Sequence, residues 1–377
     1  MSGPARRIVY LVNSSRWFLS HRFPLAVAAR ESGFEVHIAA PAAEPESEEI
    51  RSRGYQVHEY PLERAGSNPL TDIRTITEIA RIYRDVRPHI AHHVAIKPVL
   101  YGSLVARTLR VPAFVNAVTG LGYVFMASGT VASARKAAVT AAYRIACGYA
   151  NSRVIFQNPD DLESFVRARI VPAGRAVLIR GSGVNLSSFP AMPEPPGVPV
   201  VMFPSRMLWD KGLAEFVEAA RRVHAVGVPA RFVLVGDVDY NRTSVDVAQL
   251  RAWESEHIVE WWGHRSDMPA ALAQSTIVCL PSYREGLPKA LLEGASTGRA
   301  LVTTDVPGCR EVVRNGDNGL LVPVGDADAL ARAIIRLLQV PTERHQMAAR
   351  SRQRAQDEFS IDRVVKETLQ VYRSLHR

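Results

Sequence analysis

Short runs of apolar residues alternate along the chain with longer segments whose apolar residues recur every three or four positions. The short runs predict buried strands, and the periodic segments predict amphipathic helices. Strands are expected at 7–12, 35–39, 89–94, 112–117, 153–157, 176–180, 199–204, 231–236, 258–262, 276–280 and 300–303. Helices are expected at 23–32, 71–87, 132–150, 213–226, 288–297 and 327–338. This alternation indicates parallel sheets of the α/β class.

A proline-rich stretch, PAMPEPPGVP at 190–199, interrupts the pattern near its middle. It cannot continue a helix or a central strand, so it predicts a semi-rigid linker. We therefore expect an N-terminal domain at 1–190 and a second domain at 191–360, each with a doubly wound, Rossmann-like sheet. Ligands bind beyond the carboxyl ends of such strands, so the two domains are expected to face each other across a cleft.

Composition fits two globular domains in 377 residues, 47% of them hydrophobic and 22% charged. The three cysteines, Cys147, Cys279 and Cys309, form no CxxC or Cys/His cluster, so neither a disulfide framework nor a zinc site is indicated. A reduced, cytoplasmic compartment fits best. The first apolar run, 8–12, is too short for a signal peptide, and the longest uncharged run, 111–134, contains too many turn residues to span a membrane.

The net charge of +9 is placed unevenly. Residues 1–190 carry 23 Lys and Arg against 14 Asp and Glu, whereas the remainder is balanced. Residues 86–159 contain no acidic residue at all. Such asymmetry suggests an anionic partner for the first half, and a solvated basic face is the alternative.

Motifs that would indicate other nucleotide chemistry are missing from the sequence. There is no GxGxxG and no GxxxxGK[ST], and the first strand ends in Asn13-Ser14-Ser15, so a nicotinamide or ATP-hydrolysing enzyme lacks its main signal. Two DxD spacings occur, at 237–239 and 326–328, but isolated acid pairs are common. No metal or cofactor is expected.

Two strand ends in the second half carry residues suited to a phosphorylated ligand. Arg206 and Lys211 lie in SRMLWDKG, between a strand and a helix for which Asp210 is a plausible N-cap. Two cations beside a helix start suit a diphosphate, although ordinary surface basicity gives the same pattern. Gly236 and Gly263 would let the backbone approach a flat ligand, and simple turns are the alternative.

The stretch REGLPKALLE places Glu285 on a tight turn and Glu293 in the second turn of a helix. Pro288 suits the first helical position, and Gly286 allows a close backbone approach. A phosphate at the helix start and sugar hydroxyls on the two carboxylates would use both features. We expect the two acids to bind a ligand and not to act as an acid/base pair.

These loops resemble those of family-4 glycosyltransferases of the GT-B fold. The similarity rests on RMLWDKGLAEFVEAAR (206–221), FVLVGD (232–237), GHRSDMP (263–269), LPSYREGLPKALLEGASTGRALVTTDVPGCREVV (280–313), NGDNGLLVPVGD (315–326) and RGSGVNLSSF (180–189). The first half resembles bacterial enzymes that glycosylate polyprenyl-diphosphate-linked saccharides, many of which use UDP-N-acetylhexosamines. That similarity rests on NSSRWFLSHRFPLA (13–26), KPVLYGSL (97–104), NAVTGLGYVF (116–125) and FQNPDD (156–161).

The resemblance implies a retaining, metal-independent transferase that takes its sugar from a nucleotide donor. Arg206 and Lys211 would bind the donor diphosphate and stabilise the leaving group, and Glu285 would bind the donor sugar. The remaining donor-binding residues implied are Gly236, Gly263, Arg265, Gly286, Leu287, Pro288 and Glu293, the last on the ribose. The segment 361–377 would cross back onto the N-terminal domain.

The sequence departs from the family at three places. Asn13-Ser14-Ser15 replaces a glycine-glycine turn, Thr119 stands where many members have histidine, and 182–185 reads SGVN instead of NGVD. Without that histidine no side-chain base is assigned. A donor phosphate oxygen can take the acceptor proton, so electrostatic stabilisation of the departing diphosphate becomes the main contribution of the protein.

Six residues of the first half are candidates for the acceptor side: His21, His92, Lys97, Asn116, Thr119 and Gly120. His21 follows Ser20 at a predicted helix start and is as well explained as a surface histidine. His92 and His93 end a strand, so one is expected to face the cleft and the other the core. Lys97 is suited to an acceptor diphosphate. Trp17 and Phe18 are suited to a lipid surface or to core packing.

The sequence therefore predicts a retaining glycosyltransferase that moves an N-acetylhexosamine from a UDP-sugar to a polyprenyl-diphosphate-linked saccharide in cell-surface glycan or glycoprotein oligosaccharide assembly. It would act at the inner face of the cytoplasmic membrane, on an anionic surface that the basic first half favours. The alternatives are a nucleotide-sugar epimerase of the same fold, and a transferase with another nucleotide donor or a soluble acceptor. A nucleic-acid-binding protein is disfavoured because no such motif is present.

Overall fold

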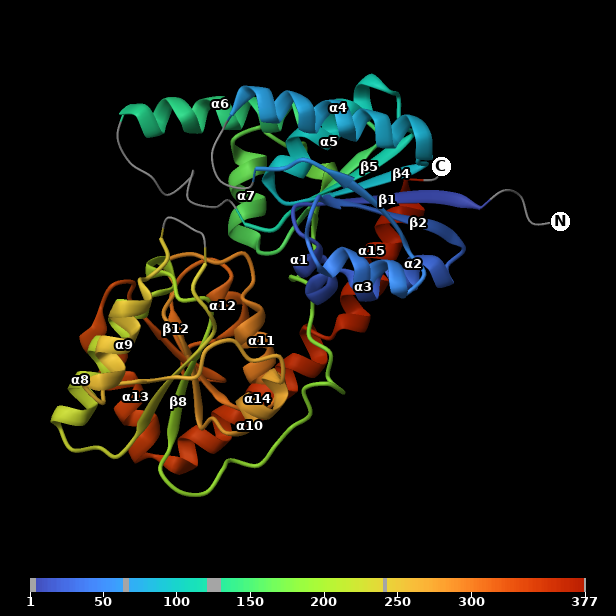
Figure 1. Ribbon diagram of the computed structural model, residues 1–377. Helices are drawn as coiled ribbons and strands as arrows, with labels where there is room; N and C mark the ends of the chain where they lie inside the picture. Colours follow the sequence, from blue (N-terminus) through green and yellow to red (C-terminus); the bar gives the residue numbers. More distant parts are fainter. Residues whose placement is uncertain (1–4, 64–67, 121–129, 240–242, 376–377) are drawn as a thin grey trace. The chain divides into compact units, whose positions relative to one another are not determined.

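The computed structural model describes residues 5–63, 68–120, 130–239 and 243–375 (Figure 1). It divides into two compact units. The first unit runs up to Ser182 and takes in the chain again from Arg363, and the second comprises Gly183–Asp362. The boundary thus lies at Ser182, eight residues before the predicted position 190.

The first unit is built on a seven-stranded parallel sheet of order β3-β2-β1-β4-β5-β6-β7. Its strands are β1 (Arg6–Val12), β2 (Phe34–Pro41), β3 (Gln56–Tyr60), β4 (Ile90–Val94), β5 (Ala113–Val118), β6 (Ser152–Phe156) and β7 (Ala176–Leu178). Strands β4 and β5 are buried along their whole length, which explains their continuous apolar sequences. The strand order reverses between β1 and β4, so this is where a doubly wound sheet offers a binding site.

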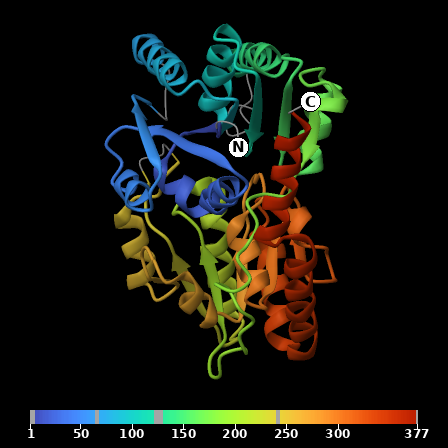
Figure 2. The same cartoon turned by 90° about the vertical axis from the view of Figure 1, so that its right-hand side faces the viewer.

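Helices cover both faces of this sheet (Figure 1). One face carries α1 (Ser15–His21), α2 (Phe23–Glu31), α3 (Glu46–Ser52) and α15 (Ile361–Ser374). The other face carries α4 (Pro69–Val86), α5 (Ile96–Thr108) and α6 (Thr130–Cys147). The helix α7 (Pro159–Arg167) precedes β7 in the chain. The red helix α15 lies along the sheet in both views (Figure 2). Its Val364, Val371 and Tyr372 share a core with Ile8 and Ile38.

The second unit has a six-stranded parallel sheet of order β10-β9-β8-β11-β12-β13. Its strands are β8 (Val200–Pro204), β9 (Arg231–Val235), β10 (Glu260–Trp261), β11 (Ile277–Leu280), β12 (Ala300–Thr304) and β13 (Gly319–Val322). Its helices are α8 (Leu213–Ala225), α9 (Val247–Ser255), α10 (Met268–Ala273), α11 (Lys289–Ser296), α12 (Cys309–Val312), α13 (Ala327–Gln339) and α14 (Pro341–Glu358). Here the order reverses between β8 and β11. Two doubly wound parallel sheets confirm the predicted fold class.

The proline-rich stretch is docked on the second unit. Arg299, only 1% exposed, donates hydrogen bonds to the carbonyl oxygens of Met192 and Pro193 at 3.1 and 3.2 Å. Arg344 holds both carboxylate oxygens of Glu194 at 2.6 and 2.9 Å. The prediction of a semi-rigid linker between domains is therefore wrong, because side chains of the second unit bind this backbone.

All three cysteines are buried and free of disulfides. In the part of the chain that the structure describes, no helix combines the length and apolar character needed to cross a membrane.

Candidate functional site

Two loops of the second unit start from the neighbouring strands where the sheet order reverses. The loop 205–212 follows β8, and the loop 281–288 follows β11. Parallel strands end at one edge, so both loops lie where a ligand binds in this type of sheet. The Tyr283 N–H donates a 3.0 Å hydrogen bond to the Asp210 carbonyl, which joins the loops. Residues from both loops can therefore act on one ligand.

Lys211 and Glu285 meet between these loops. Lys211 Nζ lies 2.6 Å from Glu285 Oε1, although the residues are 74 positions apart. The Ser282 hydroxyl donates to the same oxygen at 2.7 Å. The two charged side chains are 15% and 13% exposed, so solvent screens this pair less than a surface pair. Sequence reasoning predicted both charged residues but not Ser282, whose only signal is its place at the strand end.

Glycines allow the loops to approach this closely. Gly212 has φ +77°, and a Cβ atom there would lie 2.0 Å from the carbonyl oxygen of Pro281. Gly308, after β12, would place a Cβ atom 2.5 Å from the carbonyl oxygen of Gly286. Gly212 also precedes α8, so the predicted N-cap at Asp210 is wrong: Asp210 lies in a short 3-10 turn. Both contacts are backbone to backbone, so a larger residue would separate the loops.

Arg206, in the first loop, forms an ion pair through NH1 with Asp239 Oδ2 from the segment after β9. Asp239 belongs to one of the two DxD spacings. In the other, Asp326 accepts the Ala329 N–H at 2.8 Å as the N-cap of α13, and Asp328 pairs with Arg222 at 3.0 Å. Among the described residues, no group of three or more His, Cys, Asp or Glu side chains is arranged to hold a metal ion.

Gly236 and Gly263 lie side by side at the ends of β9 and β10. The Gly236 N–H donates to the Gly263 carbonyl at 2.8 Å, and a Cβ atom on Gly236 would lie 2.0 Å from the Ser205 carbonyl oxygen. Gly236 is thus needed for loop packing. Arg265 extends to the surface, where it makes a two-pronged ion pair with Asp267 at 2.7 and 2.8 Å.

The helix α11 begins at Lys289, one residue later than predicted, and Pro288 occupies its N-cap position. Leu287 is buried, and the Leu291 N–H donates to the Pro288 carbonyl at 3.1 Å. Glu293 lies in the second turn, as predicted, and is 9% exposed. Burial raises the pKa of its carboxyl group, and Lys289 at 3.3 Å partly opposes this rise. Glu293 is therefore a nearly buried acceptor with the cation of Lys289 beside it.

The two strand-end histidines of the first unit are both buried, so the prediction that one faces a cleft is wrong. His92, 0% exposed, contacts the Tyr372 hydroxyl through Nδ1 at 2.5 Å, and its Nε2 has no partner among the described residues. His93 contacts Tyr83 at 2.9 Å on the opposite face, where burial lowers its pKa to about 4. Both rings pack against helices and cannot reach an acceptor without rearrangement of the unit's core.

Asn116 belongs to the same core. It is fully buried, its Oδ1 lies 2.7 Å from His93 Nδ1, and it accepts a 3.0 Å hydrogen bond from Ser103. The prediction that Asn116 contacts an acceptor is wrong for this reason. Its role is to satisfy buried polar groups, which would otherwise cost about 1–3 kcal/mol each.

The other acceptor-side candidates lie near the reversal of the first sheet. Lys97, in the first turn of α5, pairs with Asp72 at 3.0 Å. Thr119 and Gly120 directly follow β5 and are partly exposed, while the rest of NAVTGLGYVF, residues 121–125, lies outside the described residues. His21 ends α1 instead of starting a helix, and its ring stacks edge-on against Trp17. Phe18 is buried, whereas Trp17 is 38% exposed.

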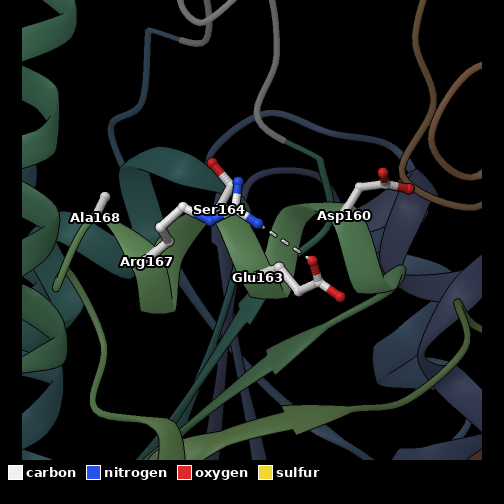
Figure 3. Close-up of a pocket in the computed structure, with 5 residues that line it drawn as sticks. All are labelled: Asp160, Glu163, Ser164, Arg167 and Ala168. Atoms are coloured by element: carbon white, nitrogen blue, oxygen red, sulfur yellow. Dashed lines mark ion pairs between the residues drawn. The ribbon is translucent and has the colours of Figure 1, made fainter.

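A surface hollow of about 450 Å³ lies along α7 (Figure 3). Its lining is polar and comprises Asp160, Glu163, Ser164, Arg167 and Ala168. Arg167 and Glu163 form a 3.6 Å ion pair across one turn of the helix. None of the predicted site residues lines it, so we place the functional site at the loops after β8 and β11 and not here.

Two family models match the chain, one on each half. The model described as glycosyl transferase 4-like matches residues 7–158, and the model described as glycosyl transferases group 1 matches residues 198–340. The second match contains the whole of the candidate site.

Curated relatives include two bacterial transferases. The N,N'-diacetylbacillosaminyl-diphospho-undecaprenol alpha-1,3-N-acetylgalactosaminyltransferase of Campylobacter jejuni is 28% identical, over 94% of this chain and 95% of the relative. The UDP-Gal:alpha-D-GlcNAc-diphosphoundecaprenol alpha-1,3-galactosyltransferase of Escherichia coli is 25% identical, over 71% of each chain.

Solved structures share the fold over nearly the whole chain. Sucrose-phosphate synthase from Thermosynechococcus elongatus has a TM-score of 0.81 at 19% identity, with 98% of this chain and 99% of that one covered. HepE of Anabaena, solved with UDP and glucose, has a TM-score of 0.78 at 17% identity, with 97% and 99% covered. The chain is therefore a glycosyltransferase of the GT-B fold, with a region that matches the glycosyl transferase 4-like model followed by one that matches the group 1 model.

Proposed function

We propose that the protein is a retaining, metal-independent hexosyltransferase that moves an N-acetylhexosamine from a UDP-sugar to a polyprenyl-diphosphate-linked saccharide. The observation that supports this best is the contact of Lys211 with Glu285 where the second sheet reverses its strand order. A cation and a hydrogen-bond acceptor side by side suit the two parts of such a donor, its diphosphate and its sugar.

In the proposed reaction the bond between the sugar C1 and the donor diphosphate breaks. The acceptor hydroxyl oxygen bonds to C1 on the same face, and its proton passes to a donor phosphate oxygen as UDP leaves. Arg206 and Lys211 stabilise the negative charge that develops on the leaving group. Glu285 accepts hydrogen bonds from the sugar hydroxyls, and Glu293 accepts them from the ribose. The protein side chains thus supply charge and orientation, without a cofactor.

The acceptor assignment rests on the relatives and on charge. Both named relatives act, by their names, on undecaprenyl-diphosphate-linked sugars. The first half of this chain carries an excess of nine basic residues over acidic ones, and the second half carries none. A diphosphate acceptor at the inner face of the cytoplasmic membrane, among anionic lipids, would be attracted to such a surface.

The test is an assay of nucleotide release with a panel of UDP-, GDP- and ADP-sugars and polyprenyl-diphosphate saccharides. We expect UDP release only with a lipid-linked acceptor, no requirement for a divalent cation, and a product that keeps the donor's anomeric configuration. Turnover with GDP- or ADP-sugars alone would refute the donor assignment. Isomerised donor formed without an acceptor would instead indicate an epimerase.

A further inference from the structure

Residues 237–239 and 243–245, which follow β9, lie along the Arg206 loop, and Asp239 brings a carboxylate to its guanidinium group. Asp239 Oδ2 pairs with Arg206 NH1, and the two residues are 33 positions apart. The side chains are partly exposed, 40% for Arg206 and 30% for Asp239, so a ligand can reach both from solvent. Neither the family resemblance nor the sequence assigns Asp239 a part in the reaction.

Backbone hydrogen bonds fix this segment against the Arg206 loop. The Met207 N–H donates to the Asp237 carbonyl at 3.0 Å, and the Val245 N–H donates to the Met207 carbonyl at 2.9 Å. Leu208 and Ser244 form an antiparallel bridge. The segment is thus paired with the loop on both sides of Asp239.

Asp239 itself is held within this pairing. Its N–H donates to the Ser244 hydroxyl at 3.0 Å. The backbone of Asp239 is therefore held beside the Arg206 loop, where its carboxylate contacts the guanidinium group. We expect Asp239 to remain beside Arg206 when a ligand binds, instead of being displaced by it.

A guanidinium group can serve a carboxylate and a phosphate together. It carries five N–H donors in a planar fork, which is more than one carboxylate can use. An arginine side chain that is already fixed does not have to be ordered during the reaction. Ordering it would otherwise cost up to about 2 kcal/mol of side-chain conformational entropy. Asp239 has an opposing effect, because its negative charge repels a bound diphosphate.

We propose that Asp239 is a positioning residue, which holds Arg206 in the orientation that stabilises the departing diphosphate. This inference rests on the proposed transfer from a UDP-sugar. It predicts different effects on kcat and on the Kd for UDP when Asp239 is replaced. Loss of Asp239 should slow the chemical step, where orientation matters, and should affect UDP binding little, because lost orientation and relieved repulsion offset each other.

The experiment compares Asp239→Ala, Asp239→Asn and Glu260→Gln in steady-state transfer and in calorimetric titration with UDP. We expect Asp239→Ala to lower kcat about 10- to 100-fold while the Kd for UDP changes less than about threefold. Asp239→Asn should recover part of kcat, because the amide oxygen still accepts from the guanidinium. Glu260→Gln breaks the Arg231 ion pair at 2.7 Å, at the start of β9, and should leave both quantities unchanged.

A double-mutant cycle separates positioning from a general structural effect. In an Arg206→Ala background, Asp239→Ala should lower kcat by less than about twofold further, because the group it orients is absent. Wild-type kcat in Asp239→Ala with tighter UDP binding would overturn the inference and make Asp239 a competitor of the donor. An undiminished effect in the Arg206→Ala background would overturn it as well. Failure of the wild-type protein to bind UDP would instead refute the proposed donor.

Discussion

At the scale of single residues, the candidate site places Glu293 where a carboxylate is poorly solvated. It is almost buried, and Lys289 lies near it. A buried charge without full compensation costs stability, so such a residue is retained for what it binds and not for what it adds to folding. In the proposed function, Glu293 would therefore lower the stability of the fold in return for donor binding.

Glu293→Gln should stabilise the protein at neutral pH by about 1 kcal/mol and weaken UDP binding. The folded-state pKa of Glu293 is raised above the ordinary 4.5, so the unfolded chain releases this proton first as pH rises. The loss of folding stability caused by Glu293 therefore begins near pH 4.5 and increases with pH until the pH exceeds the folded-state pKa. Urea unfolding between pH 4 and 8 should show the gain shrinking toward low pH.

Glu260→Gln is the control, because we expect it to change the free energy of unfolding in the opposite direction. The hydrogen bond from Arg231 lowers the pKa of Glu260, so its contribution is present at neutral pH and lost as pH falls. The substitution should slightly destabilise the protein at pH 7 and have no effect in acid. A stabilisation by Glu293→Gln that grows toward low pH would contradict the account of Glu293.

Lys211→Ala should lower kcat by about 100- to 1000-fold, because the proposed role of Lys211 is to hold a fixed cation at the leaving group and the substitution also removes a hydrogen-bond donor from Glu285. The measurement is UDP release at saturating donor. Lys366→Ala removes an exposed lysine from α15 and serves as the matched control. Equal rates for the two variants would remove Lys211 from the site.

At the scale of elements, the close packing of the loops after β8, β11 and β12 depends on glycine. Gly212 meets the Pro281 carbonyl, and Gly308 meets that of Gly286, so each loop is in contact with backbone that cannot move aside as a side chain does. The position of Lys211 relative to Glu285 follows from this packing and not only from their own contact.

Gly212→Ala should therefore lower the free energy of unfolding by about 2–4 kcal/mol and abolish most activity. The matched control is Gly227→Ala, in the same unit with φ +70° but with no atom within 4 Å of the added Cβ. This control should lower the free energy of unfolding by about 1 kcal/mol, the cost of placing alanine in a left-handed backbone conformation, and it should leave kcat unchanged. Equal destabilisation in urea unfolding would show that backbone conformation alone, without the close contact, sets the cost.

The predictability of the elements follows their burial. Strands β1 and β9 are nearly continuous apolar runs in the sequence, and both were predicted within a residue. The edge strand β3, QVHEY, has one buried residue and shows no such run. The helix α14 is largely polar, PTERHQMAARSRQRAQDE, so its apolar periodicity is weak, although Pro341 marks its start.

The sequence singles out the residues of the candidate site but does not reveal their contacts. Lys211 and Glu285 are recognised by their motifs, but a separation of 74 positions hides that they touch. The burial of His92 was missed for a related reason. Its partner Tyr372 is 280 positions away, and no local pattern reveals that α15 covers that strand.

At the scale of the whole molecule, the chain builds its first unit from both of its ends. Val364, Val371, Tyr372 and Leu375 complete an apolar core with strands from the first hundred residues. Tyr372 also joins a buried hydrogen-bonded chain, with His92 at 2.5 Å and Tyr10 at 3.2 Å. The first unit thus lacks part of its core until residues 364–375 are made.

A chain that ends at Asp362 should lose the cooperative unfolding of the first unit, because about a helix's worth of apolar surface would be exposed. The second unit, Gly183–Asp362, should keep its own transition. Urea unfolding followed by tryptophan fluorescence tests this, since four of the five tryptophans, at 209, 253, 261 and 262, lie in the second unit. Two intact transitions in the shortened chain would contradict it.

The docking of the proline-rich stretch has a consequence for exchanging domains between related enzymes. Arg299 and Arg344 bind residues 192–194 as part of the second unit. The carbonyl and amide of Val184 are likewise bonded to Ile361 and Phe359. The sequence alone would suggest joining a chimera at 190–199, because the prolines predict a linker there. Such a chimera would place these arginines against a segment from another enzyme. Junctions at 182/183 and 362/363 follow the boundaries of the two units. We therefore expect chimeras joined there to be the better choice for exchanging donor specificity between related enzymes.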